Sequence, residues 1–526
     1  MKKICLIVIV LVAVSLSANA QLLNKKNGLD QITVSALKAQ TGFLSSDWTE
    51  GRDTGSEGEY MAGDYIASML ELYGVEPGGD PIYSRDTRTG RSGAQRSYFQ
   101  NFSLMTTIAG ENSMSVTTSR EGVTRTLFLE ENVDYVSNPS YPGGSITAPV
   151  IFVGYGYRND ESAYNDFKGL DIKGKIILRL AGVPSTDGQE TSAYAGYRAS
   201  MTKDASALEL GAVGIIEVNP ANTDGSIWAE TPDFLVKSPA ERGGRRTRTR
   251  LSIPEEDSKE YFPKVTLTLK AAKSIMAGSG IDISAFSGGS VKKASRDFNT
   301  TLTISSSVTT KFIKVRNIIG YIEGKNTDEA IVIGAHYDHV GMRDGSIYNG
   351  ADDNASGTVG VMTIARAIKA TGIKPEKTIV FALWTGEEKG LLGSRYFVEN
   401  PTLPLENIKL HLNFDMISRY VSDDEPNKAL ISYTPNAPNM QLLSEKHIKE
   451  FNIALEPDYL ETESIPGGSD HASFTARKIP TTRIKPGHRE EYHTPADEVS
   501  TLDWDIFQKV VQISFLNMWE LANTEW

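Results

Sequence analysis

The 526-residue sequence has only one cysteine, Cys5, which lies near its start. A lone cysteine cannot form an intramolecular disulfide, and a structural zinc site built from thiolates needs several of them. The sequence therefore excludes a fold held together by disulfides and a cysteine-based zinc site. Any metal would have to be bound by histidine, aspartate and glutamate side chains.

Basic residues are also in deficit. The chain has 54 Lys and Arg residues against 66 Asp and Glu, which gives a formal net charge of -12. This balance argues against nucleic acid as a partner, because nucleic-acid binding usually requires a basic face. The apolar content of 40% and the charged content of 23% are typical of a soluble globular protein. The length suggests two or three domains.

Long apolar runs are absent after residue 20. The first twenty residues, MKKICLIVIVLVAVSLSANA, combine a basic start, an apolar stretch and the small-residue site Ala18-Asn19-Ala20. This pattern is typical of a signal peptide, here removed before Gln21 together with Cys5. We expect a protein exported to the periplasm or the exterior of a Gram-negative bacterium, with no membrane span in the mature chain.

Histidine is absent from the first 335 residues, and all seven histidines lie at or after His336. Any imidazole chemistry therefore belongs to the last third of the chain. Apolar runs there predict strands at 330–335, 378–384 and 408–417, and helices at 355–370, 391–399, 440–451 and 504–521. This alternation predicts an α/β fold with a mainly parallel mixed sheet flanked by helices, in which ligands bind beyond the carboxyl ends of the strands.

The region 145–290 differs from the rest in its short apolar strands and predicts an inserted small β-rich domain. The predicted organisation is a signal peptide at 1–20, the first part of the main domain at 21–144, the insert at 145–290 and the core at 291–526. The insert contains the run ERGGRRTRTR at 241–250. It is either a solvated loop or a patch that binds an acidic substrate, since arginine suits carboxylate recognition.

Polar residues follow each predicted strand of the last third. In chain order, the candidate residues are His336, Asp338, Asp352, Asp353, Glu387, Glu388 and Asp415, most of them near strand ends, and, much later in the chain, His493 and Asp497. Nitrogen and oxygen ligands of this kind suit zinc, or cobalt or manganese. A bridging carboxylate, two further carboxylates and two imidazoles would build a two-metal site. Glu388 would then bind metal while Glu387 takes a proton from water.

Each of these residues also has an ordinary structural interpretation. A histidine after a strand is usually hydrogen-bonded, as His336 would be, and Asp352 could be a helix cap. Asp415 could end a strand, and His493 could lie in a turn. Their joint occurrence in this order, in an α/β context, favours the functional interpretation.

Together the segments GAHYDHVG, NGADDNASGT, WTGEEKGLLGS, NFDMI, GGSDHASF and YHTPADE resemble peptidase family M28, the zinc aminopeptidases, and they occur in the family's order. The early segment GRDTGSEGEYMAGDYIASMLELYGVEP resembles the opening helix of that family. DFKGLDIKGKIILRL and ALELGAVGIIEV, within 145–290, resemble a protease-associated (PA) domain. The resemblance implies a zinc exopeptidase fold with an inserted PA domain.

The resemblance also implies residue roles. His336 and Asp415 would bind one Zn²⁺ and Glu388 and His493 the other, with Asp352 bridging both. Glu387 would be the general base. Asp338, Asp353, Asp470 and Asp497 would support the ligands or line the pocket, and His339 and His471 would not be ligands. The bond between Asp352 and Asp353 would be cis.

The implied activity is hydrolysis of the N-terminal peptide bond of peptides. A water that bridges two Zn²⁺ ions (Co²⁺ or Mn²⁺ being possible instead) would be the nucleophile and Glu387 the base. Three alternatives stay open: a carboxypeptidase of the glutamate carboxypeptidase type, a single-zinc glutaminyl cyclase, and a non-catalytic binding protein of the same fold.

Overall fold

The computed structural model describes residues 22–85, 92–137, 142–159, 164–182, 202–219, 251–254, 261–277, 279–283, 299–420, 422–487 and 489–526. The predicted signal peptide and the arginine run lie outside these residues. The chain divides into two compact units. One comprises Met1–Leu104 and Ile313–Trp526, and the other comprises Met105–Phe312. The candidate site residues all belong to the first unit.

The first unit contains a mixed, mainly parallel sheet. Its strands lie in the order β21-β20-β22-β19-β15-β18-β14. Their bounds are β14 Thr300–Ile322, β15 Asn326–His336, β18 Lys377–Trp384, β19 Ile408–Phe414, β20 Lys428–Tyr433, β21 Glu456–Glu461 and β22 Thr481–Lys485. β15, β18, β19 and β22 run parallel to one another, whereas β14 and β20 pair antiparallel with their neighbours β18 and β22. The predicted fold class is confirmed.

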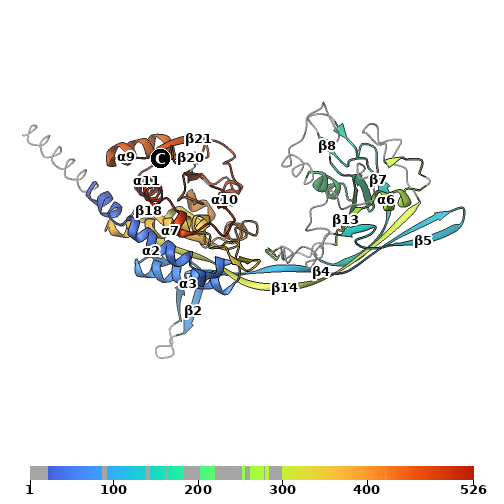
Figure 1. Cartoon of the computed structure of the whole chain (residues 1–526), viewed down its shortest axis with the longest axis horizontal. Coiled ribbons are helices and arrows are strands. Elements are labelled where there is room, and N and C mark those ends of the chain that lie inside the picture. Colours follow the sequence, from blue (N-terminus) through green and yellow to red (C-terminus); the bar gives the residue numbers. More distant parts are fainter. Residues whose placement is uncertain are drawn as a thin grey trace, which may run out of the picture. The chain divides into compact units, whose positions relative to one another are not determined.

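Helices cover both faces of this sheet (Figure 1). They are α2 Val34–Leu44, α3 Glu57–Leu72, α7 Gly357–Ala370, α8 Leu392–Glu399, α9 Met440–Phe451, α10 His471–Thr475 and α11 Trp504–Asn523. Ile331 and Ile333 of β15 pack on one face in a core shared with α2, α3, α7 and α11. Val332 points to the other face, where it packs with Phe397 of α8 and Phe474 of α10. The apolar run of β15 is therefore buried on both sides, as parallel strands usually are.

The strands and helices predicted in the last third all form, with ends within a few residues of their predicted positions. The strands β20, β21 and β22 were not predicted. β22 has the sequence TTRIK, and its polar residues Thr481, Thr482 and Arg483 are buried, as Ile484 is. Polar side chains that are buried by tertiary contacts give no apolar period, so this strand has no clear signal in the sequence.

The second unit has its own hydrophobic core. Its strands are ordered β7-β10-β11-β13-β6, with bounds Gly144–Phe152, Ile176–Leu180, Gly214–Val218, Lys264–Leu267 and Tyr135–Ser137. β7, β10, β11 and β13 are parallel. The helix α6 (Leu269–Ile275) packs into the same core. The predicted insert at 145–290 lies inside this unit, and its assignment as a PA domain stays a prediction.

Among the described residues, no helix has the length and apolar character needed to cross a membrane.

The end of α11 is attached to α9 through Glu520. Its two carboxylate oxygens contact Lys25 Nζ and His447 Nε2, each at 2.9 Å, and Lys446 Nζ at 2.6 Å. The hydrogen bond from His447, followed by those from Lys446 and Lys25, holds the pKa of Glu520 below its ordinary value of 4.5, against the effect of burial. The folded state therefore gains stability from Glu520 when this carboxylate is ionised.

We expect Glu520→Gln to lower the free energy of unfolding by about 1 kcal/mol at neutral pH. Because the pKa is depressed in the folded state, this difference should be full above pH 4.5 and shrink as the pH falls below it. Chemical denaturation at several pH values measures both effects. Glu450→Gln, at an exposed position on α9, is the control and should change little. An equal loss in both variants would contradict the role given to Glu520.

Candidate metal centre

The carboxyl ends of three neighbouring strands form one edge of the candidate centre. β15 pairs in parallel with β19 on one side and with β18 on the other. The register places His336, the last residue of β15, opposite Trp384, the last residue of β18. Glu387 and Glu388 follow β18, and Asp415 directly follows β19. These predicted site residues therefore meet at the sheet edge where ligands bind in parallel α/β folds.

The turn before α7 brings a further carboxylate to this edge. Residues Ala351–Ser356 form an irregular helical turn, and Gly350 before it has a φ of 56°. A Cβ atom at Gly350 would lie 2.2 Å from the Asp353 carbonyl oxygen and 2.5 Å from the ring of His339. Only glycine fits this position, because it has no Cβ and tolerates a positive φ.

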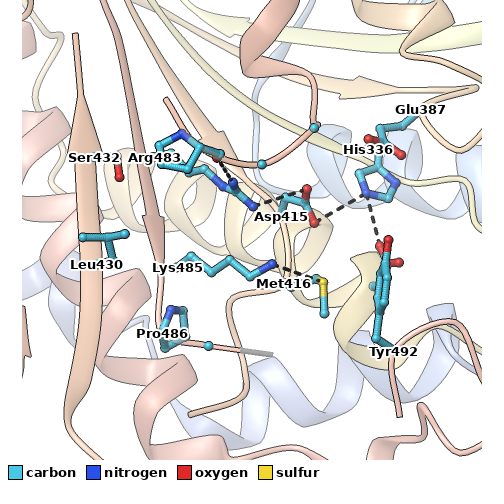
Figure 2. Close-up of a pocket in the computed structure, with 15 residues that line it drawn as sticks. His336, Glu387, Asp415, Met416, Leu430, Ser432, Arg483, Lys485, Pro486 and Tyr492 are labelled. Atoms are coloured by element: carbon cyan, nitrogen blue, oxygen red, sulfur yellow. Dashed lines mark hydrogen bonds and ion pairs between the residues drawn. The ribbon is translucent and has the colours of Figure 1, made fainter. Parts of the chain in front are cut away.

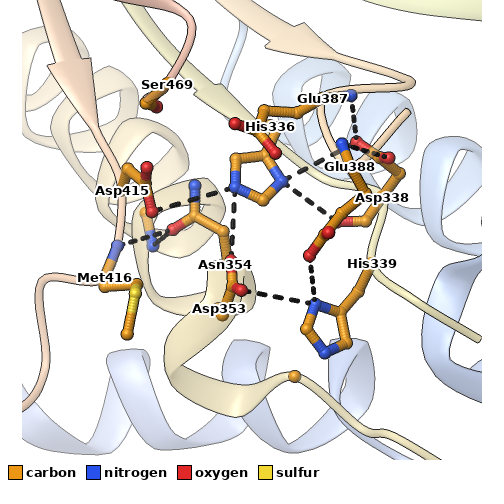
Figure 3. A network of polar contacts seen from close by, with 12 residues as sticks. His336, Asp338, His339, Asp353, Asn354, Glu387, Glu388, Asp415, Met416 and Ser469 are labelled. Carbon is orange, nitrogen blue, oxygen red and sulfur yellow. Dashed lines mark hydrogen bonds and ion pairs between the residues drawn. The ribbon is translucent and has the colours of Figure 1, made fainter. Parts of the chain in front are cut away.

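Two groups of side chains meet at Asp353 (Figure 3). In the first group, His336 Nε2 lies 3.3 Å from Asp353 Oδ1 and 3.9 Å from Asp415 Oδ1. In the second group, His493 Nε2 lies 3.0 Å from Asp353 Oδ2 and 2.9 Å from Glu388 Oε1. The two oxygens of Asp353 therefore face different groups.

The second group has one member that was not predicted. His339 Nδ1 lies 3.1 Å from Glu388 Oε1 and 3.7 Å from Asp353 Oδ2. The sequence analysis placed His339 outside the ligand set, but the structure brings it to the ligand atoms. Sequence position gave little guidance, because only the path of the loop after β15 decides which way His339 points.

The shared carboxylate belongs to Asp353, whereas the sequence analysis assigned the bridge to Asp352. Asp352 is in neither group. Its Oδ1 accepts hydrogen bonds from the Ser418 backbone N–H at 3.0 Å and the Ser418 hydroxyl at 2.7 Å. The cis peptide bond is also found one residue later than expected, between Asp353 and Asn354. Adjacent residues of one turn point in different directions, and the sequence did not show which of the two aspartates faces the site.

Asp338 and Asp497 hold the backbone around these groups. Asp338 accepts the backbone N–H of Glu387 at 3.0 Å and that of Glu388 at 3.3 Å. His336 Nδ1 lies 3.1 Å from the carbonyl oxygen of Asp338 and 3.7 Å from its carboxylate. Asp497 accepts the backbone N–H of Asp353 at 3.0 Å, and that of Asp352 at 2.8 Å. Both carboxylates thus position ligand-bearing turns.

Arg52, in the N-terminal segment, is hydrogen-bonded to the same loops. The Arg52 guanidinium is fully buried and donates to the carbonyl oxygens of Tyr337, Asn349 and Gly350 at 2.8–2.9 Å. Burial lowers the pKa of Arg52 to about 10, which still leaves it charged at neutral pH. Arg52 therefore joins the loop after β15 to the turn before α7.

Glu387 has the position expected of a proton-transfer group. It lines the pocket next to His336 (Figure 2). Burial raises the pKa of Glu387 well above its ordinary value. The charge of His336 opposes this rise of the pKa, whereas the negative charges of Asp470 and Asp415 increase it. Burial also raises the pKa of Asp470 to about 7. The predicted pocket residue Asp470 thus lies close to Glu387 without belonging to either group.

A cavity of about 500 Å³ opens beside the first group. His336, Asp353, Glu387 and Asp415 lie at one side of it. The rest of its wall comes from Met416, Leu430, Ser432, the loop Pro466–Gly468, Arg483, Lys485, Pro486, Gly487 and Tyr492. A small ligand in this cavity would contact the candidate centre directly.

The chemistry of these donors fits two divalent ions. Imidazole nitrogen and carboxylate oxygen are zinc ligands, and a carboxylate can offer one oxygen to each of two ions. His339 is buried, and its Nδ1 lies within ion-pair distance of the carboxylates of Glu388 and Asp353. Buried carboxylates at such short separations repel one another unless cations compensate them. His336, Asp353 and Asp415 would hold one ion, and Asp353, Glu388, His493 and His339 the other.

Comparison with known proteins supports this interpretation. Residues 317–517 match the model of peptidase family M28. This segment is therefore similar to that family.

Part of the chain is similar to curated proteins of known name. Leucine aminopeptidase 2 of Arthroderma otae is 30% identical over 187 residues, which cover 34% of this chain and 35% of that protein. Leupeptin-inactivating enzyme 1 of Streptomyces exfoliatus is 34% identical over 185 residues, or 35% of this chain and 38% of that protein. The chain thus spans little more than a third of the length of these curated relatives.

One solved structure is similar over nearly the whole chain. The aminopeptidase from Aneurinibacillus sp. strain AM-1 superimposes with a TM-score of 0.51 and 19% sequence identity, covering 95% of this chain and 97% of that one. At this identity the similarity establishes the fold.

Among the residues of the pocket and its support that sequence reasoning missed are the three cationic ones, Arg52, Arg483 and Lys485. Arg483 and Lys485 alternate with Ile484 in β22, so both lie on one face of the strand. That alternation is a signal, but it depends on recognising TTRIK as a strand. Arg52 carries no local signal, since its partners are backbone carbonyls that come from distant loops.

We expect Asp353→Asn to weaken zinc binding at least about tenfold, because it removes the carboxylate shared by both groups. Asp352→Asn is the matched control. Its Oδ1 can still accept from Ser418, so it should retain zinc. Metal analysis after dialysis against a weak chelator compares the two proteins. Loss of zinc in Asp352→Asn alone would restore the bridging role to Asp352.

Proposed function

We propose that this protein is a dinuclear zinc aminopeptidase, which hydrolyses the N-terminal peptide bond of peptides. The observation that supports this most is the carboxylate of Asp353, whose oxygens face two histidine-containing groups beside a cavity. The names of the M28 relatives, leucine aminopeptidase 2 among them, support the same activity. Cobalt or manganese would be compatible with the same donors.

Two zinc ions in these positions would polarise the scissile carbonyl and lower the pKa of an attacking water. The chain's own residues do the rest. Asp338 accepts the backbone N–H groups of Glu387 and Glu388, which fixes the turn so that the two side chains point to different places. Glu388 contacts His493 within the second group, whereas Glu387 lines the cavity. Glu387 takes the proton from water and returns it to the leaving amine.

One observation favours a second candidate function. Arg483 and Lys485 place two cationic side chains in the cavity wall. A carboxypeptidase that releases a C-terminal acidic residue would also use cations there, because it must bind carboxylates. We retain the glutamate carboxypeptidase type as the alternative to an aminopeptidase.

The localisation and the insert belong to the same proposal. The first twenty residues support export to the periplasm or the exterior of a Gram-negative cell. The second unit contains the region 145–290, which we propose to be a PA domain on its sequence resemblance alone.

We expect Glu387→Gln to lower kcat at least about 100-fold while zinc content stays unchanged, because the glutamine cannot accept the proton. Glu388→Gln should instead lose zinc, since Glu388 contacts both His339 and His493 in the second group. Parallel measurement of zinc content and turnover separates the roles. Near-normal turnover in Glu387→Gln would contradict its assignment as the base.

A substrate panel separates the two candidate functions. We expect release of p-nitroaniline from aminoacyl-p-nitroanilides, abolished by a chelator such as 1,10-phenanthroline and restored by zinc. Release of glutamate from blocked peptides with a C-terminal glutamate, without any aminoacyl release, would favour the carboxypeptidase. Because the N-terminus of these peptides is blocked, an aminopeptidase cannot cleave them.

A further inference from the structure

Two neighbouring strands form one wall of the cavity. β20 and β22 pair antiparallel, with Leu430 opposite Lys485 and Ser432 opposite Arg483. All four residues line the cavity, as expected for cross-strand neighbours that share a face. Met416, which directly follows the ligand candidate Asp415, lies across from them (Figure 2). This wall therefore begins at the first group and extends away from it.

Lys485 brings a positive charge into this wall without a matching negative one. Its ammonium donates to Met416 Sδ at 3.5 Å, a weak and uncharged partner. Among the described residues, none offers Lys485 a carboxylate oxygen within ion-pair distance. The charge of Lys485 acts on Asp352 only from farther away, where it opposes the rise of the Asp352 pKa that burial causes. A partly buried ammonium without a counter-ion is costly, so a ligand that supplies an anion there would be favoured.

Arg483 is engaged already. Its Nη1 donates to the Pro466 carbonyl oxygen at 2.7 Å, and its Nη2 lies 3.6 Å from Asp415 Oδ2. The side chain is only 8% exposed. Arg483 therefore holds the Pro466–Gly468 loop and Asp415 in place, which leaves Lys485 as the cation that is available to a ligand.

We propose that this cavity receives the side chain of the substrate's N-terminal residue and that Lys485 selects aspartate or glutamate there. The inference rests on the proposed aminopeptidase function. The peptide carbonyl would lie at Glu387 and His336, and the side chain would extend past Asp415 and Met416 to the Lys485 ammonium. A leucine side chain in the same place would cover the ammonium with methyl groups and leave it unpaired.

A carboxylate at Lys485 could come from an acidic side chain or from the C-terminus of a short peptide. The structure favours the side chain. A C-terminal glutamate would bring two carboxylates into the cavity, whereas only Lys485 of the two cations in the cavity wall has no carboxylate or carbonyl partner among the described residues. A single ammonium matches a single side-chain carboxylate.

The test compares p-nitroanilides of glutamate, aspartate, glutamine and leucine, none of which has a C-terminal carboxylate. We expect the wild-type protein to have its highest kcat/KM on the acidic pair. Lys485→Met, whose side chain is of similar length, should lower the ratio of kcat/KM for glutamate over glutamine about 10- to 100-fold. Lys428→Met is the matched control, because Lys428 lies on β20 outside the cavity and pairs with Glu456. It should leave the ratio unchanged.

Equilibrium binding gives a readout that does not depend on turnover. In calorimetry with the zinc-loaded full chain, free L-glutamate should bind more tightly than L-glutamine or L-leucine. Lys485→Met should remove that preference, while far-ultraviolet circular dichroism confirms that the variant is folded.

The outcomes separate this inference from the function on which it rests. Chelator-sensitive hydrolysis that prefers leucine over glutamate would leave the aminopeptidase standing and overturn the inference. Hydrolysis restricted to blocked peptides with a C-terminal glutamate would overturn both. If no peptide is cleaved, the proposed function is wrong. If glutamate and leucine then also bind equally tightly, the role of Lys485 is wrong as well.

Discussion

The carboxylate of Asp353, with one oxygen toward each of two histidine-containing groups, is the contact on which the site depends. It is only 3% exposed, and the nearby carboxylates of Asp338, Asp415 and Asp470 are also buried. So many acids cannot be buried together unless donors compensate them. Burial raises the pKa of Asp353, but the hydrogen bonds from His336 and His493 outweigh it and hold the pKa well below its ordinary value. The chain thus holds this carboxylate in its ionised, ligand-competent form.

The position of Asp353 in turn depends on backbone geometry. Gly350 allows the turn to approach His339 closely, and Asp497 accepts the N–H of Asp353. Arg52 connects the carbonyl oxygens of the loops on either side, from Tyr337 to Gly350. None of these residues is a candidate ligand. They hold the candidate ligands in position, because their hydrogen bonds to the backbone fix the direction of the turns that carry those ligands.

The cavity wall shows how the same sheet combines two tasks. The parallel strands β15, β18 and β19 place the candidate ligands at their carboxyl ends. The antiparallel pair β20 and β22 extends the sheet on one side, and its residues Leu430 and Lys485 line the cavity. A change at Lys485 can therefore alter what the cavity accepts without moving a candidate ligand, since the two sets lie on different strands.

The sequence by itself determined the α/β fold class, the strands β15, β18 and β19 with the helices α7, α8, α9 and α11, and the segments that carry the candidate site. Apolar runs such as 330–335 and 378–384 are local signals, and residues that follow a parallel strand lie at a known edge of the sheet. Only the tertiary structure decided that Asp353 rather than Asp352 faces both groups, and that His339 joins the second one. The path of the backbone decides in which direction each side chain of a turn points. Here Asp497 and Arg52, which are distant in the sequence, fix that path through hydrogen bonds. The same reason applies to β22, where polar side chains are buried by packing and Lys485 meets the cavity through a strand that the sequence pattern did not reveal.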